Sequence, residues 1–125
     1  MDISISGFPE NLTAQQVTIA SGASTSEVIA TQGRALVGVI MPATWTAAKL
    51  AFLAGIASGG VVAVYDNAGN RLAATVAAAE FIAFPADQSI FAPYLQFASV
   101  DSTTLAALNQ NQATILILLF RRFLS

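Results

Sequence analysis

The stretch from residue 35 to residue 52 constrains the fold more than any other part of the chain. Ala35–Met41 is a run of aliphatic residues with one glycine, which is typical of a strand buried on both faces. Gly38 within it predicts a bulge or a close approach of another backbone. Pro42 has no N–H to donate to a sheet, so the strand must end there. This pattern predicts a buried strand that stops at a sharp corner.

The corner after Pro42 holds the only tryptophan of the chain, Trp45. Thr44 predicts the cap of a single helical turn over Trp45–Ala48, and a second strand begins near Leu50. Trp45 could stack on a sugar together with Tyr65 or Tyr94. We favour a core or interface position, because a lone tryptophan beside a buried strand usually packs against protein.

Seven further segments show strand patterns between turn formers, at residues 16–20, 27–31, 61–65, 71–76, 80–84, 94–100 and 113–123. Asp66–Asn70 predicts a hairpin turn, with Gly69 at a positive φ. Ile115–Phe120 has no polar partner face, so we expect both sides of that strand to be covered. The sequence therefore predicts an all-β fold: one antiparallel, jelly-roll-like β-sandwich of about eight short strands over residues 16–125, with residues 1–15 as an extended N-terminal arm. No second hydrophobic core is indicated.

Charge is scarce in this chain. Charged residues make up 10% of its 125 residues and hydrophobic residues 55%, and the net charge is -2. Such a surface is poorly solvated, so we expect partners or further copies of the chain to cover much of it. The five cations are scattered except for Arg121-Arg122, so no basic stripe predicts nucleic-acid binding.

Cysteine and histidine are both absent. Their absence excludes disulfides, Cys or His metal sites and the Ser-His-Asp triad. Glu80 and Asp87 are the nearest approach to a catalytic carboxylate pair, but nothing supplies a nucleophile beside them. The acidic turn at Asp66 could suggest calcium, although turn chemistry explains it better. We therefore predict no enzyme, no cofactor and no metal.

The most apolar stretch, Leu50–Tyr65, is 16 residues long and is interrupted by Ser58-Gly59-Gly60. A membrane-spanning helix needs about 20 apolar residues. We expect no membrane partner, and a small membrane protein of the holin type stays as a rival hypothesis.

Two stretches resemble small β-sandwich structural proteins of tailed-phage virions: residues 34–42 with Trp45-Thr46 and Leu50–Phe52, and residues 81–87 with 94–99. The resemblance implies a sandwich domain on a virion surface, assembled in the bacterial host cytoplasm, without enzymatic activity. It implies a capsid decoration or cement protein that binds and stabilises the head shell, with the major capsid protein or another virion protein as partner. Because a capsid lattice supplies symmetry, we expect a homo-oligomer and favour a trimer. The alternative is a head-fibre or tail-associated module that binds a host surface glycan.

The residues that we expect at an interface lie in three places: Ile3, Ile5 and Phe8 in the arm, Trp45 at the corner, and Arg121 and Arg122 at the end of the last strand. The two arginines fit a basic contact and the solvated end of a strand equally well.

Overall fold

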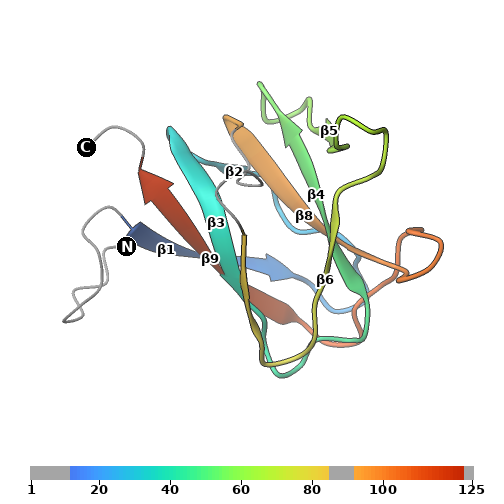
Figure 1. Ribbon diagram of the computed structural model, residues 1–125. Coiled ribbons are helices and arrows are strands. Elements are labelled where there is room, and N and C mark those ends of the chain that lie inside the picture. Colours follow the sequence, from blue (N-terminus) through green and yellow to red (C-terminus); the bar gives the residue numbers. More distant parts are fainter. Residues whose placement is uncertain (1–11, 85–91, 123–125) are drawn as a thin grey trace.

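Residues 12–84 and 92–122 are described by the computed structural model of the chain, in which two antiparallel sheets pack face to face (Figure 1). Sheet 1 has the order β1-β9-β3-β7 and contains β1 (Leu12–Ile19), β9 (Thr114–Arg122), β3 (Arg34–Ile40) and β7 (Phe81–Ala83). Sheet 2 has the order β2-β8-β4-β5, with β6 also on β4, and contains β2 (Ile29–Ala30), β8 (Tyr94–Val100), β4 (Lys49–Gly55), β5 (Val62–Ala63) and β6 (Ala73–Thr75). No helix occurs in these residues. The predicted all-β sandwich is confirmed.

The topology is that of a jelly roll. β5 pairs with Leu53 and Ala54 of β4, and β6 pairs with Lys49–Ala51 of the same strand. The two short strands therefore occupy one edge position, so that eight strand positions result. Counted this way, the chain visits sheets 1, 2, 1, 2, 2, 1, 2 and 1 in turn, which is the double Greek-key order of a jelly roll.

A small hairpin interrupts that edge. The N–H groups of Ala68 and Asn70 both donate to Asp66 Oδ1 at 2.9 Å, and Gly69 has φ +86°. The predicted turn is confirmed. Its arms are shorter than predicted, because only Tyr65 and Arg71 form a bridge with each other, and the strands beyond them pair with β4.

Gly38 allows β7 to lie against β3. The register of β3 with β9 shifts between Leu36 and Gly38, so a bulge is present as predicted. A Cβ on Gly38 would lie 2.9 Å from a ring carbon of Phe81 and 3.1 Å from the carbonyl oxygen of Ile82. The glycine thus permits the close approach that fixes Phe81 beside Ile40.

The corner after β3 is a turn and not the predicted helical turn. The Trp45 N–H donates to the Pro42 carbonyl at 3.3 Å, and the indole Nε1 donates to the Ala48 carbonyl at 3.2 Å. The side chain of Trp45 is 6% exposed and belongs to the core. Of the two expected positions, core and interface, Trp45 takes the core one, because an aromatic ring beside a buried strand gains more from packing inward than from facing solvent.

The core lies between the sheets. Phe52 contacts Phe84 and Phe97 edge to face, with ring centroids 5.6 and 5.8 Å apart. Gln110 is fully buried and satisfied, since its Nε2 donates to Ser99 Oγ at 2.8 Å and its Oε1 accepts from the Thr46 N–H at 2.7 Å. These bonds tie the segment before β9 to the corner before β4.

Sheet 1 begins four residues before the predicted start of the domain, because β1 starts at Leu12 and not at Gln16. The predicted arm therefore loses residues 12–15 to the sandwich, and its residues 1–11 lie outside the described residues. Polar side chains made this part of the strand difficult to predict from sequence. Thr13 Oγ1 and Gln15 Oε1 accept hydrogen bonds from the guanidinium of Arg34 at 2.8 and 2.9 Å. Polar residues thus occupy inward positions where alternation predicts apolar ones.

Candidate functional site

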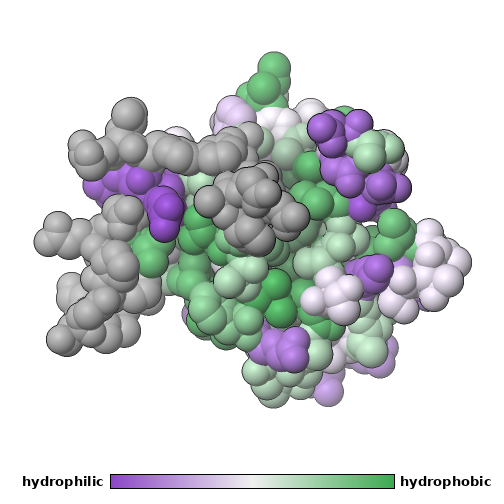
Figure 2. Space-filling view, viewed as in Figure 1, coloured by the Kyte–Doolittle hydropathy of each residue, from purple (hydrophilic) through white to green (hydrophobic). Residues whose placement is uncertain are grey.

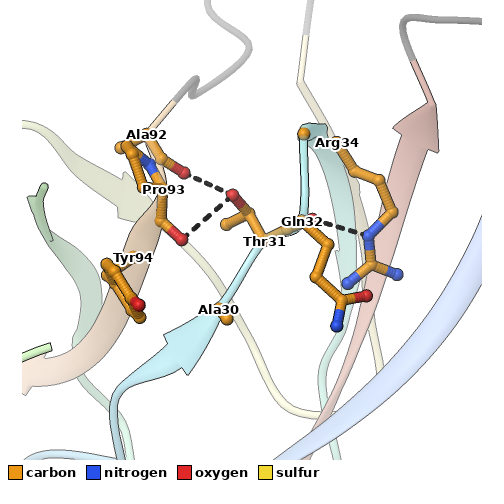
Figure 3. A pocket seen from close by; sticks show the side chains of 8 residues that line it. Ala30, Thr31, Gln32, Arg34, Ala92, Pro93 and Tyr94 are labelled. Carbon is orange, nitrogen blue, oxygen red and sulfur yellow. Dashed lines mark hydrogen bonds between the residues drawn. The ribbon is translucent and has the colours of Figure 1, made fainter. Parts of the chain in front are cut away.

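A cavity of about 530 Å³ lies between the β2–β3 connection, residues 30–34, and the segment Ala92–Tyr94 (Figure 3). The Thr31 hydroxyl lies within hydrogen-bonding reach of the carbonyls of Ala92 and Pro93, and the Thr31 N–H donates to Pro93 at 2.9 Å. These bonds hold the two walls together. The polar atoms of Thr31 therefore serve the fold.

Arg34, the one charged residue among the described residues that line this cavity, also has its donors in use. Its Nε donates to the Thr31 carbonyl at 2.7 Å, and its two Nη atoms donate to Thr13 and Gln15. Its carbon Cζ lies 4.5 Å from the ring centroid of Phe120. Burial, and second the nearby Arg122, lower the pKa of the Arg34 guanidinium, which nevertheless stays charged at neutral pH. The described lining residues therefore present no uncommitted charge to a ligand.

A different kind of candidate is the outer face of sheet 1, which we define as Ile40, Phe81, Ile115, Ile117 and Leu119. Ile117 of β9 lies opposite Ile40 of β3, which lies opposite Phe81 of β7, so these three side chains form one row across the sheet. Ile40, Phe81 and Ile115 are 39%, 60% and 47% exposed. The predicted cover is confirmed for the inner side of the last strand, where Leu116, Leu118 and Phe120 are buried, whereas Ile115 is exposed on the outer side and cover there stays a prediction.

The outer face of sheet 2, defined as Ala51, Ala98 and Val100, is covered. These side chains are at most 4% exposed and form a small second cluster with Leu105, which corrects the prediction of a single core. Residues 101–108 make the cover. Asp101 Oδ1 accepts from the N–H groups of Thr103 and Thr104 at 2.8 and 2.9 Å, and Ala107 bridges to Val100.

Three of the predicted interface residues, Ile3, Ile5 and Phe8, lie outside the described residues, as does Asp87. Trp45 is buried, as described above. Arg121 and Arg122 are exposed at the end of β9, with Arg121 between Leu12 of β1 and Ala35 of β3. Arg121 follows Ile117 and Leu119 on the outward side of β9, so it lies at one end of the outer face of sheet 1, whereas Arg122 alternates to the other side, opposite Arg34.

Sequence reasoning missed Ile40, Phe81 and Ile115 as surface residues. A signal was present in the apolar run of the last strand, which indicated that its outer side needs cover. The strand over residues 80–84 was predicted, but the direction of Phe81 follows from its pairing with Ile40, and a slip of one residue would turn it inward.

The described residues include few groups that are suited to catalysis or metal binding. Among residues 12–84 and 92–122, no group of three or more His, Cys, Asp or Glu residues could hold a metal ion. Asp66 uses its carboxylate within its own turn. In the same ranges, no helix has the length and hydropathy needed to cross a membrane.

No protein-family model, no curated protein and no solved structure matches this chain. The jelly roll is therefore assigned from strand order and register, and the resemblance to virion proteins remains a prediction from sequence.

Proposed function

We propose that this chain is a non-enzymatic structural protein of a tailed-phage virion, a decoration or cement protein that binds and stabilises the head shell. The observation that supports this proposal is the apolar row of Ile117, Ile40 and Phe81 on sheet 1, in which Ile40 and Phe81 are exposed and Ile117 is half-buried. A contiguous apolar surface of this kind marks a contact with another protein or an assembly.

The rest of the surface supports the same proposal. Charged residues are 10% of the chain, and Figure 2 shows one face filled mainly by hydrophobic and neutral residues, with hydrophilic groups at its periphery. A domain with so few charges is poorly protected against association in free solution. Permanent assembly on a symmetric surface gives such a domain a stable environment.

The jelly-roll fold is compatible with this proposal. Double-sheet jelly rolls recur in viral capsid domains and also in lectins, so the fold permits a role in a virion but does not select it. The partner in this proposal is the major capsid protein, with the chain itself as a homo-oligomer. The favoured trimer stays a prediction from lattice symmetry.

The glycan-binding alternative required an aromatic platform at Trp45. That ring is 6% exposed, and its N–H is bonded to Ala48. No observation at the described surface favours this alternative over assembly.

The proposal is tested on virions purified from the phage or prophage that encodes the chain. We expect the protein in copy numbers comparable to those of the major shell protein, and we expect heads that lack it to open at lower temperature. Absence of the chain from the purified virions, or a few copies only, would contradict the proposal.

A further inference from the structure

We infer that a second copy of this chain packs on the outer face of sheet 1, related by a two-fold axis that sets the strands of the two copies in opposite directions. This inference deepens the proposed function and rests on it for the premise that the face is covered in the assembled state.

The outer face of sheet 1 is apolar, so it is complementary to an apolar partner surface. From Ile115 to Leu119 the outward positions of β9 carry no charge, and neither do the neighbouring positions Ile40 and Phe81. An identical face satisfies this requirement, because a two-fold contact brings the same patch from each copy together. Two such sheets would pack as the sheets of a sandwich do.

The charges at the ends of the face give it a direction. Arg121 is exposed at one end, on the outward side of β9. At the other end, Glu80 directly precedes Phe81, and Glu27 Oε1 accepts from the N–H of Thr18, which lies opposite Ile115. Since a strand rises about 3.4 Å per residue, the six steps from Ile115 to Arg121 separate the two ends by about 20 Å.

This separation of charge selects one orientation. Sheets that pack face to face in the aligned mode of a β-sandwich keep their strands within about 30° of parallel or antiparallel. With strands parallel, Arg121 would face Arg121 of the second copy. With strands antiparallel, the basic end of each copy faces the acidic end of the other, twice in the dimer. Electrostatic complementarity fixes orientation in this way even where it adds little affinity.

The size of the face sets the strength of the contact. Four strands about 4.8 Å apart and at most about 20 Å long give a projected area below about 400 Å² per copy, because β7 has only three residues. This area is less than half of the ~800 Å² per partner in a standard interface. We therefore expect a dimer that dissociates on dilution and is held together by high local concentration on a virion.

The first experiment is sedimentation equilibrium of the full chain across a wide concentration range. We expect a reversible monomer–dimer equilibrium for the unchanged protein and a monomer for Ile115→Asp. Ile56→Asp is the matched control, because Ile56 is 88% exposed and lies in the loop after β4, away from the face. Dimerisation that survives Ile115→Asp, or that is lost in Ile56→Asp alone, contradicts the inference.

The second experiment tests the orientation. We expect Arg121→Glu and Glu80→Arg each to weaken the dimer by about tenfold, since each places like charges together at both ends. An equimolar mixture of the two variants should regain the affinity of the unchanged chain, because both ends of the mixed dimer then carry opposite charges. No recovery in the mixture rules out the antiparallel arrangement.

The remaining outcomes are equally decisive. A mass of three copies overturns the two-fold contact and supports the trimer. The chain could instead stay monomeric at every concentration, be present in virions, and be lost from them with Ile115→Asp. This result would show that the shell protein binds the outer face of sheet 1. The inference then fails while the proposed function stands. A dimer that is absent from virions supports the inference and removes the proposed function.

Discussion

On sheet 2 the outward side chains of Ala51, Ala98 and Val100 are 0%, 4% and 1% exposed, whereas on sheet 1 those of Ile40, Phe81 and Ile115 are 39%, 60% and 47% exposed. Both faces are apolar and both belong to the same sandwich. The difference is a loop: residues 101–108 fold back over sheet 2, and no described segment does so over sheet 1.

The loop over sheet 2 shows what such cover requires. Leu105 adopts φ +62°, a left-handed conformation that costs a bulky residue roughly 1–2 kcal/mol. Its side chain packs on the second cluster, and its carbonyl accepts from Arg71 Nη1 at 3.3 Å. A strained conformation is thus maintained where the outer face of sheet 2 is covered.

The largest expected effect comes from placing the same charge on each face. Val100→Asp buries a carboxylate under the loop, so we expect it to lower the free energy of unfolding by about 3 kcal/mol or more. Ile115→Asp should cost less than about 1 kcal/mol in the monomer, because its side chain is already 47% exposed. Urea unfolding at low protein concentration measures both values. Equal losses would remove the distinction between the two faces.

A smaller effect is expected from Gly38→Ala on sheet 1. The added methyl group meets Phe81 and the Ile82 carbonyl, so we expect a loss of about 1–3 kcal/mol and weaker dimerisation as Phe81 shifts. Gly59→Ala is the control, since a Cβ there has no atom within 4 Å. Thermal unfolding of both variants gives the comparison, and equal stability of the two would show that the contact is readily relieved.

Leu105 offers a sharper test of the cover on sheet 2. Leu105→Ala should cost about 1–2 kcal/mol through lost burial. Leu105→Gly should cost no more, although it removes one more methyl group, because glycine relieves the left-handed strain. A glycine variant clearly less stable than the alanine variant in urea titrations would show that the conformation carries no strain.

The smallest effect concerns pH. Hydrogen bonds from the N–H of Thr104, and next from that of Thr103, lower the pKa of Asp101 below its ordinary 3.8. A carboxylate with a lowered folded pKa stabilises the loop above the ordinary value, and this contribution is lost as the pH falls through the folded pKa. We expect the protection of the Thr103 and Thr104 amides, measured as exchange relative to the intrinsic rate at each pH, to fall under acid, and this dependence to be absent in Asp101→Asn. A pKa of 3.8 or higher in an NMR titration would contradict this.

Strands with strong apolar patterns were predictable. The segment 94–100 matches β8 at both ends, and the segment 35–41 matches β3 within one residue, because Pro42 stops the latter. β1 was underestimated because its inward residues Thr13 and Gln15 are polar, and they are polar because they bind Arg34. That pairing joins positions far apart in sequence, which alternation alone does not reveal.

The candidate surface was less predictable. The scarcity of charge indicated an uncovered surface without locating it. Its position depends on which face the loop 101–108 covers and on the register of β3 with β7 and β9. Both are products of tertiary packing. Trp45, the only tryptophan of the sequence, lies in the core and does not contribute to this surface.

The most direct test of this account is the solvent accessibility of isoleucine methyl groups, measured by NMR with a soluble paramagnetic probe at low and high protein concentration. Ile56, at 88% exposed, and Ile19, at 0%, serve as internal references. We expect the methyl groups of Ile40 and Ile115 to be accessible in dilute protein and to become protected as the concentration rises, while Ile56 stays accessible throughout. Accessibility of Ile40 and Ile115 that stays unchanged with concentration would contradict the claim that a second copy covers the outer face of sheet 1.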